Sequence, residues 1–64
     1  MIYRANFSCN NGTRLMKPLS DTNKQRLAKV IRDWAKSQCF IGNTYYWYVE
    51  DENGNNVMEG HGRG

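Results

Sequence analysis

The residue types that could do chemistry are few and poorly placed for catalysis. His61 is the only histidine of the 64 residues and lies between two glycines, in a stretch that does not hold a general base in a fixed geometry. The serines lie outside any catalytic motif, and no glycine-rich phosphate-binding loop is present. Glu50, Asp51 and Glu52 fall near a predicted turn, where burial cannot make one carboxyl an acid and another a base. We therefore expect a non-enzyme; a miniature metal-dependent nuclease built on this acidic run is the alternative, and chelators would inhibit it.

The two cysteines, Cys9 and Cys39, are far apart in the sequence and show no Cys-x-x-Cys spacing. Because the chain begins without the apolar run of an export signal, we expect both thiols to be reduced. A disulfide is the alternative, and it would contribute about 3 to 4 kcal/mol in an oxidising compartment. Zinc needs four ligands, and only these cysteines and His61 qualify by type. We expect no metal and no cofactor.

Length and composition allow one small domain. A chain of 64 residues, 39% of them hydrophobic, can bury a single core, which excludes large enzyme folds. Its two Trp, four Tyr and two Phe supply more anchoring surface than a disordered chain carries. No stretch approaches the roughly 18 apolar residues of a membrane helix. We predict a compact domain over residues 1–60, a flexible tail over residues 61–64, a soluble cytoplasmic protein and no membrane partner.

The N-terminal third of the sequence predicts a hairpin. Apolar and polar side chains alternate over residues 1–9, which is the period of a strand with one packed face. The Asn-Asn-Gly sequence that follows favours a turn into a second strand over residues 13–17. The register stays open, because a two-residue turn places Phe7 opposite Met16 and a three-residue loop places it opposite Leu15.

An amphipathic helix is predicted over residues 21–38. Pro18 ends the preceding strand, and Ser20 and Asp21 offer a cap and an acidic first turn. At 100° per residue, several apolar side chains fall in one narrow sector, with the last at its edge: Leu27, Val30, Ile31, Trp34 and Ala35. We expect this sector to pack on a sheet, with Trp34 as a central plug of the core.

The C-terminal third predicts two more strands and completes the fold class. Residues 44–50 are rich in aromatic and β-branched side chains, which is typical of a central strand. A Glu-Asn-Gly-Asn turn at residues 52–55 allows residues 56–59 to pair back. The predicted fold is α+β, a single ββαββ domain in which one helix packs on one face of an antiparallel sheet.

The other face of such a sheet exposes aromatic side chains, either Tyr46 and Tyr48 or Tyr45 and Trp47. Exposed aromatics stack on nucleic-acid bases or anchor a protein partner, whereas the simpler interpretation is cross-strand pairing within a small sheet. The sequence does not select between these uses.

Charge is unevenly distributed along the chain. Eight of the nine basic residues precede residue 39, and four of the six acidic residues follow it. Lys29, Arg32 and Lys36 form a basic stripe opposite the apolar sector, which is a candidate binding surface or a solvated face. The acidic run repels phosphate and so favours a protein partner over nucleic acid. The candidate binding residues are Lys29, Arg32, Lys36, Tyr46, Tyr48, Glu50 and Asp51.

The predicted helix ends in Gln38-Cys39-Phe40-x-Gly42 before an aromatic strand and an Asn-Gly hairpin. This segment resembles small phage-encoded inhibitors, and it is similar to anti-CRISPR proteins directed at the type I-F surveillance complex. The resemblance implies a non-catalytic protein that docks on a host nucleoprotein complex in the host cytoplasm and blocks or diverts its nucleic-acid binding. The matching residues are interpreted as structural, so no binding residue carries over. A small basic nucleic-acid-binding module is the alternative function.

Overall fold

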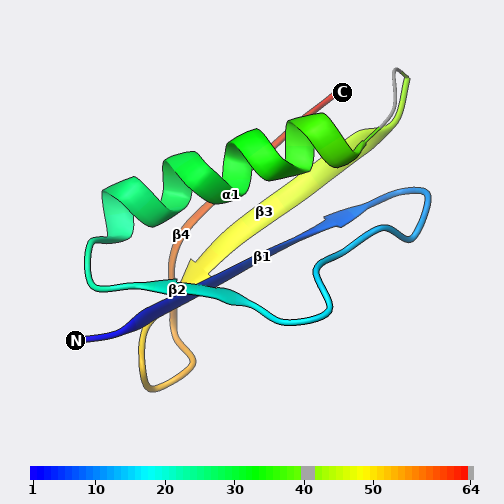
Figure 1. Ribbon diagram of the computed structural model, residues 1–64. Helices are drawn as coiled ribbons and strands as arrows, with labels where there is room; N and C mark the ends of the chain where they lie inside the picture. Colours follow the sequence, from blue (N-terminus) through cyan, green and yellow to red (C-terminus); the bar gives the residue numbers. More distant parts are fainter. Residues whose placement is uncertain (40–41, 64) are drawn as a thin grey trace.

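Two central and two edge strands form the antiparallel sheet of the computed structural model, which describes residues 1–39 and 42–63 (Figure 1). The order across the sheet is β2-β1-β3-β4, and α1 covers one face. The predicted α+β fold with ββαββ order is confirmed. The elements are β1 (Tyr3–Cys9), β2 (Leu19–Asp21), α1 (Lys24–Gln38), β3 (Thr44–Glu50) and β4 (Asn56–Arg63).

The second strand lies later in the chain than predicted. It was expected over residues 13–17, but β1 pairs with Leu19–Asp21 instead. Ser8 and Arg14 form an isolated antiparallel bridge in the register of the three-residue loop, whereas the ladder between β1 and β2 has a different register, with Ala5 opposite Leu19. The register of the two-residue turn, with Phe7 opposite Met16, is not observed. The Asn6 side chain of β1 binds the backbone of the segment that connects β1 to β2. Its oxygen accepts the Leu15 N–H at 3.1 Å, and its amide donates to the Leu15 carbonyl at 3.2 Å. A side chain thus takes hydrogen bonds that a strand ladder would otherwise make.

The helix begins at Lys24, three residues later than predicted, and ends at Gln38 as predicted. Its N-cap is Asn23, whose side-chain oxygen accepts the Arg26 N–H at 3.1 Å. Asp21, which was expected in the first turn, belongs to β2 and accepts two hydrogen bonds from the Arg26 guanidinium at 2.6 and 2.7 Å. This ion pair, together with the N–H of Asn23, holds the pKa of Asp21 well below its usual range.

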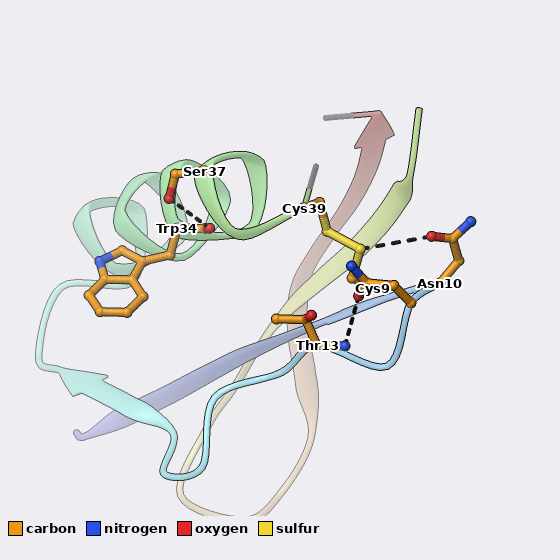
Figure 2. Close-up of a disulfide and its surroundings, with 7 residues drawn as sticks. Cys9, Asn10, Thr13, Trp34, Ser37 and Cys39 are labelled. Atoms are coloured by element: carbon orange, nitrogen blue, oxygen red, sulfur yellow. Dashed lines mark hydrogen bonds between the residues drawn. A yellow bond between two sulfur atoms is a disulfide. The ribbon is translucent and has the colours of Figure 1, made fainter. Parts of the chain in front are cut away.

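The core lies between α1 and the central strands, and Trp34 is not part of it. Phe7, Ile31 and Val49 are its largest fully buried side chains. Trp34 is 44% exposed and Val30 37% exposed, so the prediction of a central tryptophan plug was wrong. The buried sector of α1 includes two small side chains, Ala28 and Ala35, on the side of Ile31 away from Trp34. The helix therefore faces the sheet with its alanines, and Trp34 lies on the flank of the helix (Figure 2).

The last strand continues through residues expected to form a flexible tail. The predicted tail covered residues 61–64, but β4 extends to Arg63, and Gly64 lies outside the described residues. Gly60 lies opposite Trp47 in β3, and a Cβ atom at this glycine would come within 2.6 Å of the indole ring. Gly62 has the same relation to the Tyr45 ring. The glycines are therefore required because aromatic rings of β3 lie against the backbone of β4.

Replacement of Gly60 with alanine should lower the free energy of unfolding by about 1 to 3 kcal/mol, because the Trp47 ring must move to admit a methyl group. Chemical denaturation followed by tryptophan fluorescence would measure this loss. The matched control is His61→Ala, one residue along and on the opposite face, which should change stability by less than about 0.5 kcal/mol. Equal denaturation midpoints for the two variants would contradict the packing described above.

A disulfide joins Cys9 at the end of β1 to Cys39, the residue that follows α1 (Figure 2). Both residues are buried, and their Cα atoms are 6.1 Å apart, within the range that a disulfide spans. The expectation of two free thiols was therefore wrong. A sequence separation of 30 residues hid the fact that β1 and α1 end at the same side of the domain.

Candidate binding surfaces

Lys29, Arg32 and Lys36, here called the basic row, are all exposed on α1. Asp33 lies 3.9 Å from the Arg32 Nε atom, a surface ion pair of small energetic value. Among the residues that the structure describes, Lys29 and Lys36 form no ion pair. Two of the three positive charges are therefore free to interact with a ligand.

A shallow groove separates α1 from β4 and has part of the basic row on its rim. Its apolar floor comes from Ala28, Trp47 and Met58, and Lys29 and Arg32 also line it. The basic row thus faces the β4 side of the helix, whereas Trp34 lies on the opposite flank. The groove combines apolar surface with positive charge, which suits an acidic ligand that also carries apolar groups.

Tyr46 and Tyr48 lie on the sheet face that α1 leaves open, which decides the alternative left by the sequence. Their neighbours in β3, Tyr45 and Val49, are buried under the helix. The two exposed-face rings stack with centroids 6.2 Å apart and an interplanar angle of 27°. Tyr46 is 38% exposed, so part of one aromatic ring is available to a partner.

The Tyr46 hydroxyl is held by polar groups of β4. It donates a hydrogen bond to the Glu59 carboxylate and accepts one from the Asn56 amide at 3.3 Å. The hydrogen bond to Glu59 raises the pKa of Tyr46, because it stabilises the protonated hydroxyl. The tyrosine is therefore fixed in place and presents its ring rather than its hydroxyl.

The acidic run at the end of β3 is largely engaged in local structure. The Asp51 carboxylate accepts the backbone N–H groups of Asn53 and Asn55 at 2.9 and 3.0 Å, and these bonds lower the pKa of Asp51. Glu52 accepts the Ile2 N–H at 2.7 Å. Asp51, predicted as a binding residue, thus organises the turn between β3 and β4, and Glu50 belongs to the end of β3.

The seven predicted binding residues do not form one site. The basic row lies on the helix, above one face of the sheet, and the tyrosine pair lies on the other face. The acidic residues lie near the β3–β4 turn, at one end of the sheet. A single small ligand cannot contact all three groups.

Sequence reasoning missed two residues of β4, His61 and Arg63, which line a shallow pocket together with Tyr46. They were assigned to the tail because glycines interrupt the pattern of side chains. The available signal was the period of two: Glu59, His61 and Arg63 alternate with Gly60 and Gly62.

Within residues 1–39 and 42–63, no group of three His, Cys, Asp or Glu side chains could hold a metal ion. No helix in this part of the chain has the length and apolar character required to cross a membrane.

The described surfaces define a small α+β domain with a positively charged helix and an aromatic sheet face. No protein-family model matches the chain, and no curated protein or solved structure shows significant similarity to it. The motif that carries the resemblance to phage inhibitors has structural roles where it is described: Cys39 forms the disulfide, and Gly42 has a φ of +93°, which favours glycine. Phe40 lies outside the described residues.

Proposed function

We propose that this protein is a non-catalytic inhibitor or adaptor of the phage type. It docks on a host nucleoprotein machine, such as a CRISPR surveillance complex, and blocks or diverts its nucleic-acid binding. The observation that supports this proposal best is the basic row beside an apolar groove. Positive charge on a rigid helix attracts nucleic-acid phosphates and acidic protein groups, and a nucleoprotein complex presents both.

A small nucleic-acid-binding module is the second candidate, and the exposed Tyr46 and Tyr48 rings favour it. Modules that bind single strands combine aromatic rings with a positively charged groove along one surface. In this protein the rings and the basic row lie on opposite faces of the sheet, and the Glu59 carboxylate contacts Tyr46. This separation supports a protein or nucleoprotein partner over nucleic acid alone.

The proposed place of action is the host cytoplasm, and the cysteines provide a check on it. Cytosolic proteins are kept reduced, whereas stable disulfides are typical of oxidising compartments. A cytoplasmic inhibitor must therefore stay folded when Cys9 and Cys39 are reduced. Loss of structure on reduction would move the proposed site of action to an oxidising compartment.

Charge reversal at the two lysines of the basic row should strongly weaken the inhibitor's activity. The purified type I-F surveillance complex is mixed with a fluorescent target duplex, and fluorescence anisotropy reports how much duplex the added protein displaces. We expect the Lys29→Glu/Lys36→Glu variant to need at least about tenfold more protein than the wild type, which corresponds to about 1.4 kcal/mol of lost binding free energy. Increasing salt should reduce the difference, because screening weakens exposed charge interactions.

The matched control is Arg14→Glu/Lys17→Glu, which makes the same charge change in the exposed segment between β1 and β2. It should act like the wild type if position matters and not net charge. Tight binding of the wild type to duplex alone would favour the nucleic-acid module. Absence of both duplex displacement and duplex binding would contradict both proposed functions.

A further inference from the structure

β4 is a long edge strand, and a further strand could pair with it. It is the last strand in the sheet order β2-β1-β3-β4, and in the described residues no strand lies beyond it. In Figure 1, β4 passes behind α1, at the side of the sheet away from β2. Edge strands present a row of unpaired N–H and C=O groups, which are a template for another chain.

The hydrogen-bond pattern shows which residues of β3 bond to β1 and which bond to β4. The Asn10 N–H donates to the Thr44 carbonyl at 3.0 Å, in continuation of the ladder between β1 and β3. Residues of a central antiparallel strand direct their backbone groups alternately to one neighbour and then to the other. Even-numbered residues of β3 therefore bond to β1, and odd-numbered residues bond to β4.

This alternation leaves alternate β4 residues, Glu59 and His61 among them, with backbone groups directed away from β3. Trp47 is odd-numbered and lies opposite Gly60, so these two residues exchange the ladder hydrogen bonds. Glu59 and His61, on either side of Gly60, therefore direct their N–H and C=O groups away from β3. A strand that added to this edge would pair with Glu59 and His61.

The surface beside this edge is positively charged on its helix side. Lys29 and Arg32 line the groove between α1 and β4. Gly60 and Gly62 carry no side chains on that face, so no β4 side chain at these two positions separates the edge from the groove. Alternate side chains of an added strand can therefore reach both the basic residues and the apolar floor, which includes Trp47 and Met58.

We propose that the free edge of β4 binds an extended, acidic segment of a protein partner as an additional β-strand. Main-chain hydrogen bonds to Glu59 and His61 provide affinity, and acidic side chains at alternate positions of the segment contact Lys29 and Arg32. The inference rests on the proposed function in that the protein acts by binding a partner, and it adds the surface and the chemistry of that partner.

Charge selects this occupant over the others. Two copies of the chain joined through β4 would bring two basic rows together, and each chain already carries a formal net charge of +3. A nucleic acid would satisfy the positive charges but has no backbone that continues a β-ladder. An acidic protein segment satisfies both the charges and the edge.

Strand addition at the edge can be tested with a proline at a position whose N–H makes no hydrogen bond to β3. His61→Pro removes an outward-facing donor while the bonds between β3 and β4 remain, and edge strands tolerate proline. His61→Ala is the matched control, since it removes the same side chain and keeps the N–H group. The probe is a display library of short random peptides, selected on the wild-type protein and then synthesised with a fluorescent label.

We expect the selected peptides to carry acidic residues at alternate positions and to bind His61→Ala like the wild type. They should bind His61→Pro, and also Lys29→Glu/Arg32→Glu, at least about tenfold more weakly, a change equivalent to about 1.4 kcal/mol. If His61→Pro does not fold, the same peptides with N-methylated alternate amides replace it, and methylation of one alternating set should remove binding.

Several outcomes would overturn the inference. These are a library that yields no binder, selected peptides without acidic residues, and peptides that bind His61→Pro as tightly as His61→Ala. A dimer seen by sedimentation that His61→Pro dissociates would assign the edge to a second copy. Oligonucleotide binding that needs Lys29 and Arg32 but ignores His61→Pro would assign the groove to nucleic acid. Displacement of duplex from the surveillance complex by His61→Pro at wild-type strength would reject the edge and leave the proposed function intact.

Discussion

Reduction of the Cys9–Cys39 disulfide should lower the free energy of unfolding by about 3 to 4 kcal/mol. The two cysteines are 30 residues apart, and a cross-link that closes a loop of this length restricts the unfolded chain by about that amount. The core of a domain of this size rarely supplies more than about 3 to 5 kcal/mol. Reduction should therefore bring the protein close to its unfolding threshold at room temperature.

Thermal melting with and without a reductant would measure this effect, and alkylation followed by mass spectrometry would count the free thiols. The control is the Cys9→Ala/Cys39→Ala variant, whose melting temperature should not respond to the reductant. Two alkylated thiols in protein never exposed to reductant would contradict the disulfide. An unchanged melting temperature after complete reduction would show instead that the core suffices, and would be compatible with action in a reducing cytoplasm.

Ile31→Ala should lower the free energy of unfolding by about 2 to 5 kcal/mol, because Ile31 is fully buried where α1 meets the sheet. Trp34→Ala should have a much smaller effect, below about 1 kcal/mol, although tryptophan is the larger side chain. Trp34 is 44% exposed on the flank of the helix, so its removal leaves no closed cavity.

Chemical denaturation of both variants would test this order, with circular dichroism as the signal because one variant lacks a tryptophan. Lys36→Ala, on the exposed side of the same helix, serves as the control and should stay within about 0.5 kcal/mol of the wild type. A greater loss for Trp34→Ala than for Ile31→Ala would mean that the helix is rotated relative to the orientation described here.

The predictions that held depended on side chains close together in the sequence. The alternation in β1, the aromatic run of β3 and the end of α1 at Gln38 follow from periodicity and from turn residues. The ββαββ order follows from the succession of these patterns. Local patterns are reliable here because each strand or helix must present one apolar face, whichever element covers it.

The predictions that failed depended on contacts between distant segments. Residues 13–17 have an acceptable strand sequence, but the Asn6 side chain bonds to this segment and β1 pairs further on. Residues 61–63 looked like a tail because Gly60 and Gly62 carry no side chains, yet the rings of β3 require those glycines. In both cases the group that decides the conformation lies outside the segment itself, the Asn6 side chain in the first case and the aromatic rings of β3 in the second, and the pattern of the segment does not reveal it.

Some features of the candidate surfaces were also predictable from the sequence, and others depended on the tertiary structure. The sequence by itself determined that basic residues form a stripe on the helix and that one pair of aromatic residues in β3 must face away from it, because helical and strand periods place them so. Only the tertiary structure decided that this pair is Tyr46 and Tyr48, that Cys9 and Cys39 meet, and that the basic row lies beside the free edge of β4. The physical reason is that the period of a pattern is set along the chain, whereas its orientation depends on which packing of distant apolar groups buries the most surface without a clash.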